Sequence, residues 1–223
     1  SWLPSDPEQY PLPCSQKKRE ENMNIFCVGQ NYAKHAKELG NEVPKDPIFF
    51  QKASSCLSTS DVIKIPRGRE IHYELELVMI FGKSGKSIPK SEALNHISHW
   101  CLGLDLTDRE RQNKRREKGL PWFDAKSFPG AAVITDREPV DWQKLEQDLW
   151  LTINGVEVQR GNVSNMVFDI STLISVLSEI VTFQDGDFLF TGTPSGVGPL
   201  HDGDELMLGL GDETKGSLHV TSS

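Results

Sequence analysis

Two glutamates stand two positions apart in a stretch that otherwise has the composition of a buried β-strand. Residues 71–81 read IHYELELVMIF, with Glu74 and Glu76 near the middle. Because strand side chains alternate between faces, both glutamates fall on the same face. One interpretation is a solvated outer face. The other is a strand that enters the protein interior, where two buried like charges are costly unless a divalent cation holds them.

A third carboxylate, Asp105, stands near the end of another apolar stretch, residues 100–106. Leucines alternate along this stretch, so Asp105 shares the opposite face with Gly103, which would leave open space beside the carboxylate. From Asp105 the chain can also turn helical, which would place Arg109 and Gln112 one turn and two turns above it. In that alternative Asp105 is only the cap at the start of a helix.

Three carboxylates at strand ends form a hard ligand set made of oxygen alone. Such a set favours Mg²⁺, with Mn²⁺ as an alternative, over Zn²⁺. Three protein ligands leave about three positions of an octahedron open, and the carboxylate and keto oxygens of a 2-oxo acid can fill two of these. The ion would then act as a Lewis acid that stabilises an enolate.

A histidine and a lysine are candidates for acid–base chemistry. A helix predicted over residues 32–39 places His35 and Glu38 on one face. They form either a surface pair, or a general base in which the glutamate orients the histidine and makes it more basic. Lys126 lies among aromatic and small residues, where partial burial would lower its pKa. The alternative is that its ammonium group extends to solvent.

The remaining elements indicate how these side chains are positioned. The apolar spacing of residues 165–178 predicts a core-packing helix. Residues 191–198 form a glycine-rich loop without the lysine of a P-loop, so it is either a tight connection or a surface of backbone and threonine groups for a carboxylate. Short apolar stretches, two of them joined by the hairpin turn Asn154-Gly155, predict strands at residues 25–28, 48–52, 62–65, 131–135, 150–153 and 156–158.

Composition restricts the class of protein. The chain has 223 residues and a net charge of −8, which argues against non-specific binding to nucleic acid. The basic run at residues 114–116 is interpreted as a solvated helix face. The 4 cysteines fit no zinc module, and Cys27 and Cys101 lie in apolar runs, which predicts reduced thiols and a reducing compartment. No membrane span or secretory segment is predicted, so we expect a cytoplasmic protein.

Taken together and in order, these motifs resemble the fumarylacetoacetate hydrolase family, in particular its short single-domain members that act on acylpyruvates or oxaloacetate. Two positions depart from the family pattern: Gln30, where many relatives carry arginine, and Ala53, where proline is common. Both bear on substrate preference and not on the metal chemistry. The matching segments are residues 28–32 with His35 and Glu38, 72–77, 104–107 with Arg109 and Gln112, 119–122, 125–126, 191–194 and 196–198.

The resemblance implies an α+β, mostly β fold, in which mixed sheets roll around a metal site, and it implies a homodimer. Residues 1–22 are rich in proline and then in charge, which predicts an irregular lead-in. Residues 23–223 are predicted to form the catalytic domain.

The resemblance also implies a role for each acidic candidate. Glu74, Glu76 and Asp105 would bind Mg²⁺. His35 and Glu38 would form the pair that activates water, carried on a segment that acts as a lid.

Further residues would bind the substrate. Lys126 and Gln112 would hold the substrate oxygens and the leaving enolate, and Thr193 would contact the substrate carboxylate. Arg109 would bind substrate or only brace Asp105.

Our first prediction of function is a Mg²⁺-dependent hydrolase that cleaves the C–C bond of acylpyruvate-type 1,3-diketo acids through a metal-bound enolate. The alternatives are an oxaloacetate keto–enol tautomerase or decarboxylase, and an isomerase of hydroxydienoic diacids of aromatic catabolism, since all require the same ligands. The pair His35 and Glu38 favours hydrolysis, because decarboxylation needs no activated water. A non-catalytic metal-binding scaffold is disfavoured, because it would need neither that pair nor Lys126. The expected partner is a small 2-oxo or 1,3-diketo acid, and neither nucleic acid nor a membrane.

Overall fold

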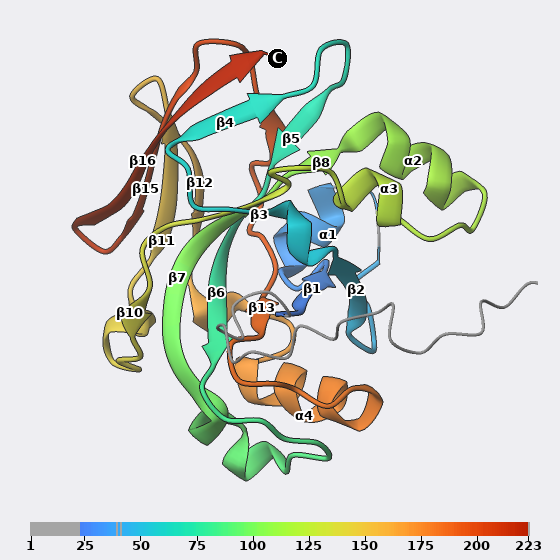
Figure 1. Ribbon diagram of the computed structural model, residues 1–223, viewed down its shortest axis with the longest axis vertical. Coiled ribbons are helices and arrows are strands. Elements are labelled where there is room, and N and C mark those ends of the chain that lie inside the picture. The colour runs from blue at the N-terminus through green and yellow to red at the C-terminus, as the bar shows by residue number, and fades with distance from the viewer. Residues whose placement is uncertain (1–22, 39, 41, 223) are drawn as a thin grey trace, which may run out of the picture.

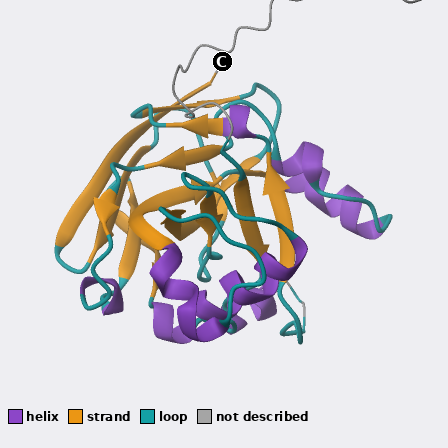
Figure 2. Cartoon of the chain, turned by 60° about the horizontal axis from the view of Figure 1, so that its bottom comes forward, coloured by secondary structure: helices purple, strands orange, loops and turns teal. Residues whose placement is uncertain are grey.

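The computed structural model describes residues 23–38, 40 and 42–222, without the side chains of residues 35–37. Within this part of the chain, three mixed or antiparallel β-sheets form the body of the molecule (Figure 1). The helices lie mainly at the periphery of the strands (Figure 2). The predicted α+β, mostly β fold with rolled mixed sheets is therefore confirmed, while the predicted lead-in at residues 1–22 lies outside the described residues.

The largest sheet contains the longest buried strands. Its members are β1 (Ile25–Gly29), β2 (Ile48–Lys52), β3 (Leu57–Ser58), β6 (Leu75–Phe81), β7 (Ile97–Asp105), β9 (Ala132–Ile134), β10 (Glu138–Pro139) and β13 (Phe188–Phe190). Their order is β2-β1-β13-β6-β7-β9-β3, and β10 pairs with β7. β6 and β7 form the central antiparallel pair, in which Leu77 lies opposite Leu102. Every residue of β6 is buried, so this strand is covered on both faces.

Two smaller sheets complete the strand framework. One has the order β12-β11-β15-β16-β4 and consists of β4 (Val62–Ile65), β11 (Leu149–Ile153), β12 (Val156–Gly161), β15 (Glu205–Leu210) and β16 (Glu213–Ser222). The other has the order β14-β5-β8 and consists of β5 (Ile71–Tyr73), β8 (Thr107–Asp108) and β14 (Gly198–Pro199). Asn154 and Gly155 have φ values of 52° and 80° and join β11 to β12 in the predicted hairpin.

The helices are short, and the longest of them begins at a side-chain cap. They are α1 (Ala33–Glu38), α2 (Arg109–Glu117), α3 (Phe123–Lys126) and α4 (Ile170–Ile180), with 3-10 helices at Ser54–Cys56, Lys90–His96, Lys144–Glu146 and Val163–Asn165. The core helix α4 begins later than predicted, because Asp169 accepts a hydrogen bond from Thr172 N at 2.7 Å and caps it there. No helix in the described residues combines the length and the apolar character that crossing a membrane requires.

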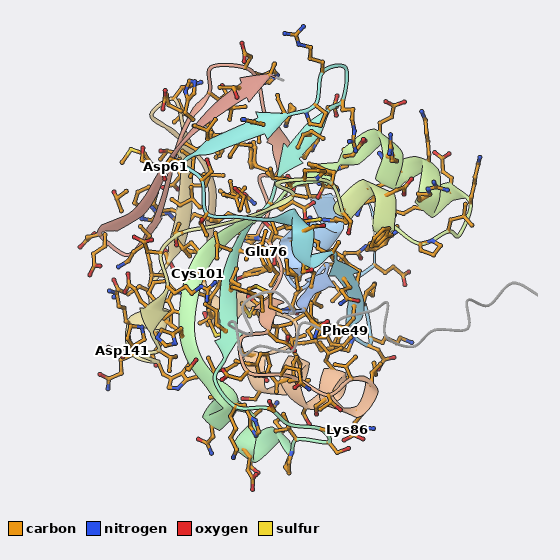
Figure 3. All side chains as sticks on the ribbon, viewed as in Figure 1. Phe49, Asp61, Glu76, Lys86, Cys101 and Asp141 are labelled. Carbon is orange, nitrogen blue, oxygen red and sulfur yellow. The ribbon has the colours of Figure 1, made fainter. Side chains whose placement is uncertain are left out.

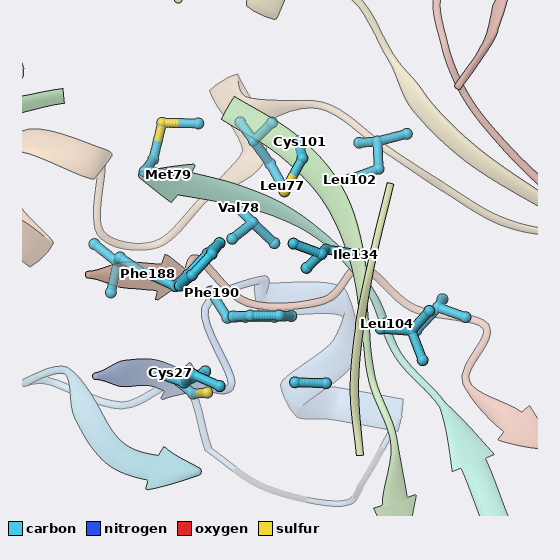
Figure 4. Close-up of a cluster of buried hydrophobic side chains, with 14 of the residues drawn as sticks. Cys27, Leu77, Val78, Met79, Cys101, Leu102, Leu104, Ile134, Phe188 and Phe190 are labelled. Atoms are coloured by element: carbon cyan, nitrogen blue, oxygen red, sulfur yellow. The ribbon is translucent and has the colours of Figure 1, made fainter. Parts of the chain in front are cut away.

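The core is one continuous cluster of buried apolar side chains, and its residues on β1, β6, β7, β9 and β13 of the large sheet can be seen in Figure 4. Gly103 of β7 lies inside it, and a Cβ added there would come within 2.8 Å of Val78 and Phe190. The open space predicted beside this glycine is therefore wrong, because the two apolar side chains fill it. Cys27 and Cys101 are buried free thiols, as predicted, and burial raises the pKa of Cys101 to about 12.

Replacement of Gly103 by alanine tests how tightly the centre of the large sheet is packed. We expect Gly103→Ala to lower the free energy of unfolding by about 1–3 kcal/mol, because Val78 and Phe190 must move to admit the methyl group. The measurement is chemical denaturation followed by circular dichroism. Gly29→Ala is the matched strand control, since its added Cβ meets nothing nearer than 3.4 Å. Equal losses in both variants would contradict the packing argument.

Candidate metal centre

The carboxylates meet at a corner where the chain passes from one sheet to another. β5 pairs with β8 in the small sheet, whereas β6 pairs with β7 in the large one. The chain passes from one sheet to the other at Glu74 and again after Asp105. A 2.9 Å hydrogen bond from Asp105 N to Glu74 O joins these two crossing points. The single strand predicted over residues 71–81 is therefore wrong: it breaks at Glu74, because its two parts have different partners.

Glu74, Glu76 and Asp105 form one cluster. One carboxylate oxygen of each residue lies within 4.8 Å of the others. Their exposed fractions are 5%, 1% and 1%, which excludes the solvated outer face and confirms the interior alternative. Figure 3 places Glu76 near the middle of the molecule.

The glycine-rich loop after β13 closes one side of this cluster. Gly192 N donates a hydrogen bond of 2.8 Å to Glu76 Oε2. Gly192 has a φ of +101°, and an added Cβ would lie 2.7 Å from Asn31, so only glycine fits here. The loop is thus a structural wall of the site and more than a tight connection.

Asp105 is the last residue of β7 and does not start a helix. α2 begins at Arg109, and its cap is Asp108, which accepts a 2.9 Å hydrogen bond from Arg111 N. The helical alternative for Asp105 is therefore wrong. Gln112 nevertheless lies beside the site, because it is one turn along α2 from Arg109.

The guanidinium group of Arg109 is paired with Glu74, and its Nη1 donates to Gln112 Oε1 at 2.6 Å. Among the described residues, this guanidinium forms no hydrogen bond or ion pair with Asp105. Arg109 therefore braces Glu74 and not Asp105, which corrects the prediction.

Lys126 lies between two of the carboxylates. Its Nζ donates to Asp105 Oδ2 at 2.6 Å, to Glu74 Oε2 at 2.9 Å and to Thr107 Oγ1 at 2.7 Å. The side chain is only 3% exposed, so the alternative in which it extends to solvent is wrong. Burial lowers the pKa of Lys126, but the Asp105 and Glu74 carboxylates raise it, and the net direction is upward, opposite to the predicted lowering.

Lys52 is a residue of the site that the sequence analysis missed. It is fully buried at the end of β2, with Nζ 2.6 Å from Asp105 Oδ1. The same ammonium group donates to the backbone carbonyls of Leu106 at 3.0 Å and Lys126 at 2.6 Å. Lys52 could have been found by the same feature that indicated Asp105, which is a charged residue at the end of an apolar strand.

The donor set fits a hard divalent cation. Asp105 Oδ1 has no hydrogen-bond partner among the described residues, although the Lys52 ammonium is close to it. Burial raises the pKa of Glu76 well above its usual range, and repulsion from Asp105 and Glu74 adds to the rise. A cation relieves this repulsion, so Glu74, Glu76 and Asp105 are the residues that would hold it.

A narrow cavity that is partly open to solvent is lined by Glu74 and Glu76. Thr193 and Gln30, one of the two positions that depart from the family pattern, are part of its lining. Arg116 also lines the cavity. Arg116 is half-buried, so it is less solvated than predicted for residues 114–116, because one face of α2 points inward.

The pairing of His35 with Glu38 stays a prediction, because the histidine side chain lies outside the described residues. The predicted helix is confirmed from Ala33 to Glu38. Glu38 accepts hydrogen bonds of 3.1 Å and 3.2 Å from Gly196 N. α1 is thereby linked to the glycine-rich loop at the edge of the site.

Comparisons with known proteins agree with this geometry. The family model described as fumarylacetoacetate hydrolase C-terminal matches residues 24–221. A mitochondrial oxaloacetate decarboxylase of Dictyostelium discoideum is 40% identical over 196 residues, covering 86% of this chain and 90% of the relative. The mitochondrial oxaloacetate tautomerase FAHD1 of Mus musculus is 40% identical over 197 residues, covering 86% and 88%. A crystal structure of fumarylpyruvate hydrolase from Pseudomonas aeruginosa, in complex with Mn²⁺ and pyruvate, is 30% identical with a TM-score of 0.80 and covers 90% of both chains.

Addition of Mg²⁺ or Mn²⁺ to chelator-treated protein tests the metal centre. At a free ion concentration near 100 times Kd, we expect Tm to rise by roughly 5–10 °C, because the ion binds only the folded chain. Glu76→Gln should abolish the rise, since the amide keeps the acceptor for Gly192 N but loses the charge. Glu70→Gln is the control, because this carboxylate is 61% exposed. A full rise in Glu76→Gln would remove Glu76 from the ligand set.

Proposed function

The chain belongs to the fumarylacetoacetate hydrolase family, and on that premise we propose that it acts on oxaloacetate as a keto–enol tautomerase or decarboxylase. The chain is an enzyme, as its relatives are. The two curated relatives described above act on oxaloacetate, so they favour this alternative over the acylpyruvate hydrolase that the sequence first suggested. Hydrolysis of a 1,3-diketo acid has support only at the level of the family.

The observation that carries the proposal is the charge of the site. The three carboxylates of the centre are matched by the three buried cations of the described residues, Lys52, Lys126 and Arg109. A bound divalent ion therefore leaves two positive charges in excess. Oxaloacetate carries two carboxylates and balances this excess, whereas an acylpyruvate with a neutral acyl group, such as acetylpyruvate, carries one. Charge complementarity in a buried site thus favours the dicarboxylate.

A divalent ion held by Glu74, Glu76 and Asp105 would act as a Lewis acid toward the 2-oxo acid. Lys126 donates hydrogen bonds to the adjacent Glu74 and Asp105 carboxylates, and these raise the pKa of its ammonium group despite burial. It is therefore suited to stabilise negative charge on a substrate oxygen and not to act as a base. Both enolisation and decarboxylation of oxaloacetate develop such a charge.

The polar lining of the cavity would hold the substrate. Thr193 and Gln112 are buried and present hydroxyl and amide groups for a carboxylate and a keto oxygen. Arg109, Gln112 and Arg116 follow one another at i, i+3 and i+7, on one face of α2. We assign Arg116, the outermost of these, to the distal carboxylate of the substrate.

His35 remains the predicted general base for tautomerisation, with Glu38 as its partner. That reaction removes a proton from C3 and returns one to the oxygen on C2, so it needs a group that accepts and donates protons. Decarboxylation breaks the bond between C3 and C4 and releases CO₂. The electron pair of that bond forms the enolate of pyruvate, which then takes up a proton at C3, so no base is required. The two activities therefore differ in their need for His35.

Two further predictions concern the whole protein. A homodimer stays a prediction. A cytoplasmic location also stays one, and the Dictyostelium and mouse relatives are named as mitochondrial proteins.

A proton NMR assay of the products tests the proposed function. Purified protein with Mg²⁺ is mixed with oxaloacetate in one tube and acetylpyruvate in another, each beside a chelator control. We expect faster keto–enol exchange, or release of pyruvate, from oxaloacetate only where the ion is present. Acetate and pyruvate from the second tube, with no effect on oxaloacetate, would instead establish the acylpyruvate hydrolase.

The role of Arg116 has its own test. We expect Arg116→Gln to raise KM for oxaloacetate about three- to tenfold with a smaller change in kcat, because the variant loses one charge-assisted contact. Binding of pyruvate, which lacks the distal carboxylate, should change little. Lys114→Gln is the control, since this lysine lies on the exposed face of the same helix, 66% exposed. If the binding of oxaloacetate and of pyruvate were weakened equally, Arg116 would not contact the distal carboxylate.

A further inference from the structure

Gln159 is a buried side chain of β12, 1% exposed, to which the proposed function assigns no role. Its Oε1 accepts a hydrogen bond from Leu75 N at 2.8 Å. Its Nε2 donates to Thr193 Oγ1 at 2.9 Å and to Pro194 O at 2.9 Å. Leu75 lies between the two glutamates of the metal centre, and Thr193 lines the cavity, so the amide joins two parts of the site.

The partners of this amide fix its orientation. Leu75 N can only donate and Pro194 O can only accept, so the amide oxygen must face Leu75 and the amide nitrogen must face Pro194. A flipped amide would place donor against donor and acceptor against acceptor. The two protons on Nε2 are then directed to Pro194 O and to Thr193 Oγ1.

The hydroxyl group of Thr193 is consequently an acceptor toward Gln159 and must direct its own proton elsewhere. Among the described residues, the acceptor recorded for that proton is Pro194 O at 3.5 Å, which is long and already receives the shorter bond from Gln159. The proton is therefore available to an acceptor in the cavity.

We infer that Gln159 is a positioning residue, which presets the Thr193 hydroxyl as a hydrogen-bond donor to the carboxylate of the substrate. The inference rests on the proposed function only in taking a 2-oxo acid carboxylate as the ligand of Thr193. A hydroxyl group without this partner can turn a lone pair toward the anion, which repels it. A donor fixed before binding avoids the free-energy cost of reorienting the group.

Gln159→Glu reverses the polarity of this contact. One oxygen of the introduced carboxylate still accepts from Leu75 N, but the other has no proton to donate to Thr193. The threonine proton would then be drawn to the introduced carboxylate, and the oxygen lone pairs would face the substrate.

Calorimetric titration of Mn²⁺-loaded protein with pyruvate measures the effect. We expect Gln159→Glu and Thr193→Val each to weaken pyruvate binding about tenfold, because each removes a hydrogen bond to a charged group. The double variant should be no weaker than the weaker single variant, because both changes remove the same bond. Thr193→Ser, which keeps the hydroxyl, should bind within about twofold of the parent.

Other results would overturn the inference. Losses that multiply in the double variant would mean that Gln159 does not act through Thr193. A loss of Mn²⁺ affinity in Gln159→Glu, with pyruvate affinity unchanged at saturating ion, would mean that the residue acts through Leu75 on the carboxylates. If Gln159→Glu does not fold, Gln159→Met replaces it in the same cycle, since it also removes the donor to Thr193. If the losses in the two single variants do not add in the double variant, but the protein does not turn over oxaloacetate, the proposed function is wrong and this inference stands.

Discussion

The burial of three carboxylates at one corner is the constraint on which the rest of the structure depends. Glu74, Glu76 and Asp105 lie within 4.8 Å of one another and are nearly inaccessible to solvent. Uncompensated, such a cluster would cost several kcal/mol per charge, which exceeds what one domain can offset. The compensating cations come from the edge strand β2 and from the helices α2 and α3, so the charge of the centre links these elements to it.

The corner itself follows from the exchange of strand partners. Glu74 and Asp105 stand where two neighbouring chain segments leave the large sheet for the small one, and a backbone hydrogen bond joins them there. Their side chains are therefore positioned by the backbone of paired strands and not by loops. The groups proposed to meet the substrate lie on other elements around this fixed point: Thr193 on a loop and Arg116 on a helix.

Local pattern was enough to predict most strands and all three acidic residues, because a charge inside an apolar stretch is visible without knowledge of the fold. It was not enough where partners are distant in the chain. Gln159 bonds Leu75 across 84 positions, and Lys126 bonds Glu74 across 52. The aromatic neighbours of Lys126 in the sequence predicted a lowered pKa, and distant carboxylates reversed its direction. The break at Glu74 was missed for the same reason, since strand exchange is a property of the pairing.

The carboxylates alone do not separate the activities of this family, since each activity needs the same charged centre. The difference must then come from groups that match the charge and shape of one substrate. In this chain they are ordered along α2: Arg109 contacts Glu74, Gln112 contacts Arg109, and Arg116 lies farther along the same face. In the proposed function, a dicarboxylate that binds the centre through its 2-oxo acid end would extend toward this arginine. The helix face would then connect the chemistry of the centre to the choice of substrate, which a solvated basic run would not do.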